Sequence, residues 1–163
     1  MAHVLLGLGA NLGDREAALQ SVVEAMAAGP FTAIRCSRIY ETPPWGVTDQ
    51  PPFLNAIVAA DTALTPSQVL TFAQDCEQAA HRVHDVRWGP RTLDVDVIAY
   101  DDMVQDDPAL TLPHPLAHVR AFVLVPLLDV EPDFFLRGHG FAVDLRNRLD
   151  ATGIIPVGEL RVP

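Results

Sequence analysis

The sequence predicts an α+β fold in which helices pack against one mostly antiparallel sheet. The segments with strand or helix character follow in the order strand, helix, strand, strand, helix, strand, which is typical of that class. The chain has 163 residues, 49 % hydrophobic and 20 % charged. That length and balance suit one packed core and are too small for two comfortable ones. We therefore expect a single domain over residues 1–163.

The first elements are a strand, a helix and a second strand. Residues 3–8 are apolar and end in glycines, which favours a buried strand rather than a signal peptide. Asp14 can cap a helix over residues 15–28, which places its apolar side chains on one face and ends at a Gly-Pro pair. Loose alternation over residues 32–40 predicts the second strand, and the prolines of residues 43–52 predict a stiff irregular loop.

The middle of the chain repeats this pattern. Residues 53–60 read as a strand. Residues 65–68, Thr-Pro-Ser-Gln, form a capping box for a helix that turns Val69, Phe72, Ala73 and Cys76 inward. Residues 81–90 are polar and predict a loop.

Residues 93–100 predict the next strand, and the acidic, proline-rich residues 101–115 predict a loop. Residues 119–128 are apolar and favour a helix, although Pro126 argues against one. A last strand, helix and tail are expected from residue 134 onward.

Charge and composition exclude several classes of function. The net charge of −10 repels nucleic acid and anionic membranes, so we expect neither as a partner. All 11 basic residues are arginines, which excludes Schiff-base lysine chemistry and leaves Arg as the permanent cation for phosphate. Cys36 and Cys76 are too far apart in sequence for a Cys-x-x-Cys motif and are expected to pack as small apolar groups. No apolar stretch is long enough to span a bilayer, so a cytoplasmic location is expected.

The strongest motif is residues 87–96, Arg-Trp-Gly-Pro-Arg-Thr-Leu-Asp-Val-Asp. Residues two apart in a strand point the same way, so Asp94 and Asp96 share one face. A hard cation such as Mg²⁺ would relieve their repulsion and could bridge to phosphate. A solvated strand face is the alternative; Ile98 and Tyr100 argue against it, because they are expected on the same face as the acids.

Arginines surround this motif. Arg82, Arg87 and Arg91 fall within one predicted loop, and Arg120 follows later. A loop arginine is usually just solvated, but three beside a proposed metal site in an acidic protein are typical of a phosphate clamp. Trp88 among them is either a packing anchor or a ring that closes over adenine.

A third cluster could hold a flat heterocycle. The proline-rich segment carries Trp45 and leads into Phe53 and Asn55. Aromatic rings stack on the faces of a heterocycle, and an amide supplies one donor and one acceptor to its edge. A proline-stiffened turn with core aromatics explains the same residues.

Two other patterns give weaker evidence of a functional site. The glycines at positions 7, 9 and 13 lack the spacing of a dinucleotide site, so we interpret them as a tight strand-to-helix turn. His114 and His118 are four apart, but Pro115 and the absence of an intervening Glu disfavour a zinc helix. His114 is either a structural residue on a rigid turn or a phosphate contact.

Together these blocks resemble the 6-hydroxymethyl-7,8-dihydropterin pyrophosphokinases of folate synthesis. The matching residues run in family order from residue 4 to about residue 132: the turn of residues 9–12, Tyr-Glu-Thr-Pro-Pro at 40–44, the 49–55 segment, residues 77–82, the 87–96 block, Leu-Pro-His at 112–114 and Arg120-x-Phe122. The resemblance implies a ferredoxin-like α+β fold. It also implies transfer of the diphosphate of ATP to the pterin hydroxymethyl group, with release of AMP, and binding of two Mg²⁺ ions beside ATP.

The resemblance also implies roles for individual residues. The metal ligands are Asp94 and Asp96, and the catalytic group is Arg82, Arg91, Asp94 and Asp96. The ATP contacts are Gln74, Glu77, Arg82, Trp88, Arg91, Ile98, His114 and Arg120. The pterin contacts are Thr42, Pro43, Pro44, Trp45, Phe53, Asn55, Trp88, Asp94 and Phe122.

Further expectations concern partners and alternatives. We expect a monomer that takes ATP and a pterin as small-molecule substrates. His84 stands where many relatives have a second arginine, which predicts slower or more pH-sensitive turnover. Two alternatives stay open: another small-substrate phosphotransferase, which would release ADP, and a non-catalytic nucleotide-binding module, which would release neither nucleotide.

Overall fold

The computed structural model describes residues 1–43, 51–84 and 93–163, and for residues 82–84 the backbone alone. Its elements, in chain order, are β1 (Ala2–Ala10), α1 (Arg15–Ala28), β2 (Phe31–Cys36), β3 (Arg38–Thr42), β4 (Phe53–Thr62), α2 (Pro66–His84), β5 (Leu93–Tyr100), η1 (Ala117–Val119), α3 (Ala121–Val130), β6 (Phe135–Leu136), β7 (Gly140–Phe141), α4 (Ala142–Asn147) and β8 (Ile155–Glu159).

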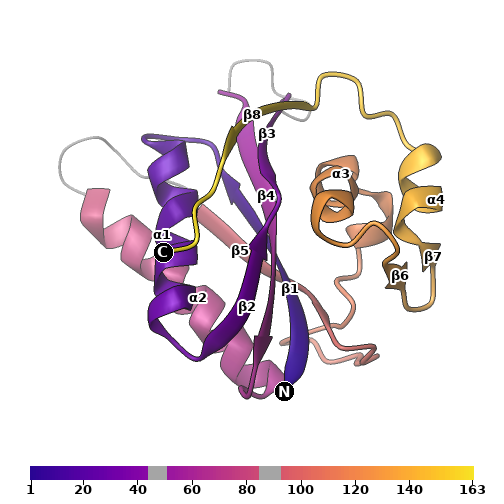
Figure 1. The fold of residues 1–163 in the computed structure, drawn as a ribbon, viewed down its shortest axis with the longest axis horizontal. Coiled ribbons are helices and arrows are strands. Elements are labelled where there is room, and N and C mark those ends of the chain that lie inside the picture. Colours follow the sequence, from indigo (N-terminus) through magenta and orange to yellow (C-terminus); the bar gives the residue numbers. More distant parts are fainter. Residues whose placement is uncertain (44–50, 85–92) are drawn as a thin grey trace.

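The centre of the molecule is an antiparallel sheet with helices packed on it, as the sequence predicts, and the helices cover both of its faces (Figure 1). The strand order is β5-β1-β4-β3-β8, and β2 pairs with a further stretch of β4. Figure 1 shows α1 and α2 on one face of the sheet and α3 and α4 on the other. The small β6–β7 hairpin lies beside α4.

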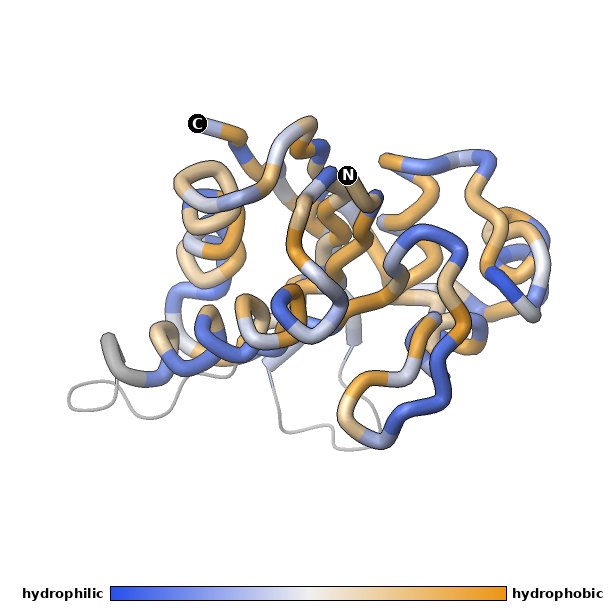
Figure 2. Tube along the Cα trace, turned by 90° about the horizontal axis from the view of Figure 1, so that it is seen from below, coloured by the Kyte–Doolittle hydropathy of each residue, from blue (hydrophilic) through white to orange (hydrophobic). Residues whose placement is uncertain are grey.

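Two apolar layers hold these parts together. One lies between the sheet and helices α1 and α2, and the other between the sheet and helices α3 and α4. Figure 2 shows apolar residues concentrated along the central strands. Because neighbouring residues of a strand point to opposite faces, central strands such as β4 contribute to both layers.

The two long helices begin where the sequence predicts. The Asp14 carboxylate accepts a hydrogen bond from the Ala17 backbone at 3.1 Å, which satisfies a free amide in the first turn of α1. At α2 the capping box is reciprocal: the Gln68 side chain accepts from the Thr65 backbone at 2.9 Å, and the Thr65 hydroxyl accepts from the Gln68 backbone at 3.3 Å.

The cysteines pack as predicted. Both are free, and both lie partly buried against the layer beneath α1 and α2. Burial raises the pKa of each thiol to about 11, and nearby acidic groups add to the rise at Cys76. Both thiols therefore stay protonated at neutral pH.

The single strand expected over residues 32–40 is wrong, because Ser37 divides it into β2 and β3. The Ser37 backbone donates to the carbonyl of Ile57 at 2.8 Å, and the Ser37 hydroxyl accepts from the Ile57 backbone at 2.8 Å. The hydroxyl thus takes the place of a ladder carbonyl. The two Ser37 bonds keep both β2 and β3 paired with β4, although the strand is interrupted between them.

One helix boundary differs from the prediction, and the helix favoured over residues 119–128 is confirmed as α3. Helix α2 continues to His84, so the loop expected from residue 81 begins later. Helix α3 forms despite Pro126, which lies buried inside it. Proline costs the helix one hydrogen bond, but the strongly apolar segment gains more by burying its side chains against the sheet.

The expected C-terminal tail instead contains a strand of the main sheet. β8 pairs antiparallel with β3, where Arg38 lies opposite Glu159 and Glu41 opposite Ile155. The pairing of this strand therefore depends on a partner more than a hundred residues away in the sequence.

The helices of the described residues are too short or too polar to span a bilayer.

Candidate active site

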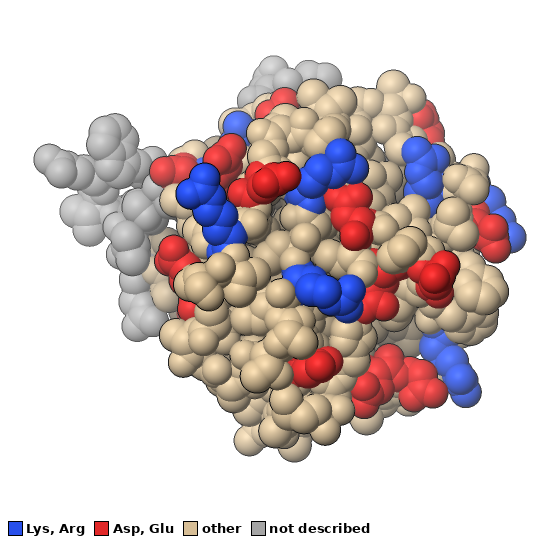
Figure 3. Space-filling model, viewed as in Figure 1, with Lys and Arg blue, Asp and Glu red and all other residues tan. Residues whose placement is uncertain are grey.

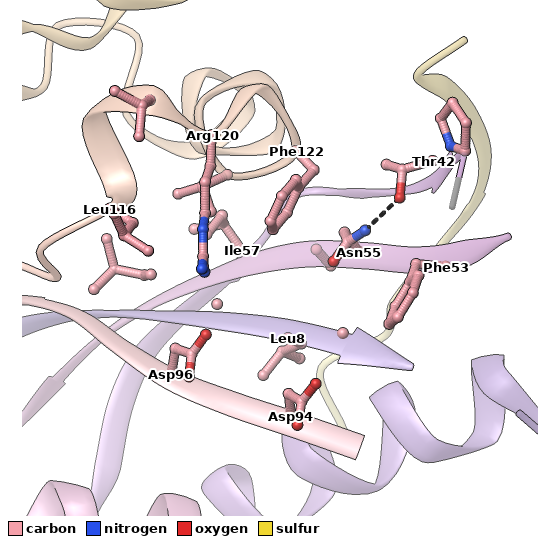
Figure 4. Close-up of a pocket in the computed structure, with 17 residues that line it drawn as sticks. Leu8, Thr42, Phe53, Asn55, Ile57, Asp94, Asp96, Leu116, Arg120 and Phe122 are labelled. Atoms are coloured by element: carbon pink, nitrogen blue, oxygen red, sulfur yellow. Dashed lines mark hydrogen bonds between the residues drawn. The ribbon is translucent and has the colours of Figure 1, made fainter. Parts of the chain in front are cut away.

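A cavity of about 560 Å³ lies between the sheet and the segment that leads into α3. Strands β1, β4 and β5 form its floor and one wall, and η1 and α3 form the opposite wall (Figure 4). Its lining residues are Gly7, Leu8, Gly9, Thr42, Pro43, Phe53, Asn55, Ala56, Ile57, Asp94, Asp96, Ile98, Leu116, Val119, Arg120, Phe122 and Val123.

Asp94 and Asp96 lie on the face of β5 that borders the cavity (Figure 4). The residues between and beside them, Leu93, Val95 and Val97, are buried in the layer under α1 and α2. The alternation expected from the sequence is therefore present. Burial raises the pKa of Asp94, and the neighbouring Asp96 carboxylate raises it further, while His81 opposes the rise. A nearby cation would relieve this repulsion.

The end of β5 departs from that alternation. A register shift lies between Leu5 and Leu6, where the partners change from Ala99 to Val97, so β5 carries an extra residue at this point. Ile98 stays on the cavity side, but Tyr100 turns to the other face, where its hydroxyl donates to the Leu64 carbonyl at 2.7 Å. The expectation that Tyr100 shares the face of the aspartates is wrong.

The other end of the cavity combines aromatic rings with an amide. Phe53 comes from β4 and Phe122 from α3, and Figure 4 shows their rings on either side of Asn55. The Asn55 amide nitrogen donates to the Thr42 hydroxyl at 2.8 Å, and both residues are buried. That bond fixes the orientation of the amide, as recognition of a heterocycle edge requires.

Arg120 supplies a cation between these two ends. Its side chain reaches into the cavity toward Asp96 (Figure 4), and its guanidinium lies 5.4 Å from the ring centre of Phe122. No carboxylate of a described residue lies within ion-pair distance of it. Arg120 is therefore available to an anionic ligand.

His114 is held in one tautomer. Its backbone donates to the Ile98 carbonyl at 2.8 Å, and its Nδ1 accepts from the Leu116 backbone at 3.1 Å. Burial lowers the pKa of His114, Asp96 opposes this and Arg120 adds to it. The imidazole is thus neutral at physiological pH with its proton on Nε2, where it can donate to a ligand.

Helix α2 approaches the acidic strand from the side. β5 is an edge strand, and the Glu77 carboxylate accepts a hydrogen bond from the Val95 backbone at 3.0 Å. Burial raises the pKa of Glu77, the Val95 bond opposes this, and Asp94 and Asp96 add to the rise. Gln74, one turn earlier, is exposed and does not line the cavity.

Several residues that the sequence predicts for the site lie outside the residues that the structure describes. Pro44, Trp45, Arg87, Trp88 and Arg91 fall in the two undescribed segments, and for Arg82 and His84 only the helical backbone is described. The predicted contacts that line the cavity are Thr42, Pro43, Phe53, Asn55, Asp94, Asp96, Ile98, Arg120 and Phe122. Glu77 and His114, like Gln74, are not among its lining residues.

The sequence interpretation missed two kinds of lining residue. Gly7 and Gly9 lie inside β1, not in a turn, and face the two aspartates from the neighbouring strand. A Gly-x-Gly strand paired with an Asp-x-Asp strand would have been the signal. Leu116 and Val119 form an exposed apolar rim that no sequence pattern singles out.

One cavity thus combines paired carboxylates, an arginine with no ion pair to a described residue, and two aromatic rings beside a fixed amide. Such a combination is typical of a phosphotransferase that acts on a small heterocycle. The chain matches the family model described as 7,8-dihydro-6-hydroxymethylpterin-pyrophosphokinase (HPPK) over residues 5–132. The chain belongs to this family.

Curated relatives agree over most of their length. The 2-amino-4-hydroxy-6-hydroxymethyldihydropteridine pyrophosphokinase of Methylorubrum extorquens is 46 % identical over 155 residues, which cover 94 % of this chain and 98 % of the relative. The protein of the same name from Mycobacterium tuberculosis is 46 % identical over 142 residues, covering 81 % of this chain and 74 % of the relative.

Solved structures confirm the fold. A Plasmodium falciparum HPPK-DHPS A437G chain superimposes with a TM-score of 0.69 at 14 % identity, covering 90 % of this chain and 45 % of that one. This chain thus spans less than half of that longer protein. At such low identity the likeness concerns the fold alone, and it agrees with the ferredoxin-like α+β architecture that the resemblance implied.

Proposed function

We propose that Asp94 and Asp96 bind Mg²⁺ together with ATP for the diphosphate transfer that this family catalyses. The chain transfers diphosphate from ATP to 6-hydroxymethyl-7,8-dihydropterin in folate biosynthesis. The observation that carries the metal assignment is the pair of carboxylates on the cavity side of β5, with Arg120 reaching toward them from the opposite wall.

The residues present suit a hard divalent cation. Mg²⁺ prefers oxygen ligands and usually keeps several waters and phosphate oxygens alongside one or two carboxylates. No three His, Cys, Asp or Glu side chains gather into a metal cage in the part of the chain that the structure describes. Two carboxylates open to a cavity fit an ion that arrives with ATP. When bound, the ion neutralises phosphate charge.

The opposite end of the cavity suits the pterin. Phe53 and Phe122 offer ring faces for stacking, and the fixed Asn55 amide offers hydrogen bonds to the heterocycle edge. This arrangement would point the hydroxymethyl group toward the aspartates. Thr42 and Pro43 complete that end.

The reaction asks the protein mainly for positioning and charge neutralisation. The hydroxymethyl oxygen attacks the β-phosphorus, the bond from that phosphorus to the oxygen shared with the α-phosphate breaks, and AMP leaves with that oxygen. The hydroxyl proton passes to water. Arg120 and His114 donate to phosphate oxygens, and we assign Arg82, Arg91 and Trp88 to the nucleotide side from their place in the family pattern.

The test is to incubate the protein with Mg-ATP and 6-hydroxymethyl-7,8-dihydropterin and to identify the nucleotide product. We expect AMP and the pterin diphosphate. ADP would indicate single phosphoryl transfer, and neither nucleotide would indicate a non-catalytic binding module. An Asp96→Ala sample should fold normally and lose activity; retained activity there would refute the metal assignment.

A further inference from the structure

Part of the cavity floor is bare backbone, because Gly7 and Gly9 lie where β1 passes beneath it. Gly9 pairs with Asp94 on one side and with Asn55 on the other, and Gly7 pairs with Asp96. Directly paired residues of antiparallel strands point to the same face. A side chain at position 9 would therefore project between Asp94 and the Asn55 amide, and one at position 7 would project between Asp96 and Ile57.

A methyl group at either position would make a tighter than ordinary contact, and its neighbour would have to move by a few tenths of an ångström. A Cβ at Gly9 would lie 3.1 Å from the Asn55 Oδ1, closer than ordinary van der Waals contact. Asn55 has little freedom to move away, because its nitrogen is bonded to the Thr42 hydroxyl at 2.8 Å. A Cβ at Gly7 would lie 3.1 Å from the Ile98 Cδ1.

We propose that Gly9 is a positioning residue for the pterin, acting through Asn55, and that Gly7 is a positioning residue for the nucleotide, acting through Ile98. The inference rests on the proposed function. Gly9 borders the amide end of the cavity, whereas Gly7 borders the side where Ile98 and Asp96 lie. A methyl group at each position should therefore weaken binding of a different substrate.

The variants are Gly9→Ala and Gly7→Ala, with Gly158→Ala as the matched control. Gly158 also lies in a strand, but a Cβ there would be 3.5 Å from Glu16 and 3.6 Å from Ile39, which is ordinary contact away from the cavity. For each variant we would measure kcat, the KM of each substrate, calorimetric binding of the pterin, and thermal unfolding.

Gly9→Ala should raise the pterin KM and weaken pterin binding by roughly tenfold or more, while the ATP KM changes by less than about threefold. Gly7→Ala should show the reverse order, and Gly158→Ala should change neither. The inference is overturned if a folded Gly9→Ala keeps the pterin affinity of the unchanged protein, or if the two variants affect both substrates alike. Absence of AMP with the unchanged protein would instead refute the proposed function.

A double variant tests the route through Asn55. Asn55→Ala removes the oxygen that the new methyl group would meet, so adding Gly9→Ala to it should raise the pterin KM no further. The double variant lacks the clash and should fold even if Gly9→Ala alone does not. A further loss of pterin affinity equal to that of the single variant would show that Gly9 does not act through Asn55.

Discussion

Asp94 and Asp96 owe their shared direction to the pleat of a single strand, and their chemistry to where that strand lies. Burial raises the pKa of Asp94, and the charge of Asp96 raises it further. Neither acid makes an ion pair with another described residue. Two such groups beside a cavity remain costly until a cation joins them. The pair is thus better suited to binding than to stability.

Thr42 provides a test at the scale of one hydrogen bond. Replacing it with Val keeps the shape but removes the acceptor that orients the Asn55 amide. We expect the pterin KM to rise roughly fivefold, as loss of about 1 kcal/mol of orientation implies, with the ATP KM nearly unchanged. Thr71→Val, on the exposed side of α2, is the control. Equal effects of both variants would contradict the assignment.

At the scale of elements, α2 and α3 hold the two walls of the site. The Glu77 carboxylate occupies the free edge of β5 at Val95, between the two aspartates, so α2 fixes the strand that carries them. On the other side, α3 is tied to β3. The Tyr40 hydroxyl donates to Asp129 at 2.7 Å, and the Arg38 backbone donates to the same carboxylate at 3.1 Å.

Substitution of Glu77 should separate its hydrogen bond from its charge. Glu77→Ala leaves the Val95 amide without its acceptor, so we expect faster hydrogen exchange there and a loss of about 1–2 kcal/mol of stability. Glu77→Gln can still accept the bond and removes repulsion with Asp94 and Asp96, so exchange should stay slow. Gln74→Ala, exposed on the same helix, is the control. Similar exchange rates in all three variants would contradict this role.

The tie between α3 and β3 predicts a pH dependence of stability. Burial raises the pKa of Asp129, but hydrogen bonds from Arg38 and Tyr40 outweigh it and hold the pKa below its ordinary value. A lowered pKa in the folded state adds stability above the unfolded pKa of about 3.9, and that stability is lost as the pH falls through the folded value.

Asp129→Asn keeps an acceptor oxygen but removes the charge, so the bonds from the Tyr40 hydroxyl and the Arg38 backbone should weaken. We therefore expect a loss of about 1 kcal/mol of stability at neutral pH. The difference should shrink below about pH 4. Urea unfolding at several pH values would measure it, with the exposed Asp133→Asn as control. A difference that stays constant with pH would show that the carboxylate charge does not matter.

For the whole molecule, the sheet acts as a platform. One face carries the apolar layer under α1 and α2, and the other carries both the layer under α3 and α4 and the site. Figure 3 shows acidic and basic side chains interspersed over the viewed face, so the net charge of −10 is not gathered there into a single-sign patch. Local attraction for phosphate must then come from individual cations such as Arg120.

Sequence alone predicts those features that short-range pattern determines. The cap at Asp14, the capping box at Thr65 and the alternation of Asp94 and Asp96 each involve only a few neighbouring residues. The features that sequence missed depend on distant partners: the pairing of β8 with β3, the break at Ser37 and the shift that turns Tyr100 away. Such long-range pairing is not visible in the pattern of neighbouring residues along the sequence.

The central claim is that Asp94 and Asp96 together anchor a divalent ion beside ATP. The most direct test titrates Mn²⁺ into the protein with a non-hydrolysable ATP analogue and follows the ion by electron paramagnetic resonance, comparing the unchanged chain with Asp94→Asn, Asp96→Asn and Asp133→Asn. We predict Mn²⁺ binding that is weakened at least about tenfold in the first two variants and unchanged in Asp133→Asn. Equal Mn²⁺ affinity in all four proteins would contradict the claim.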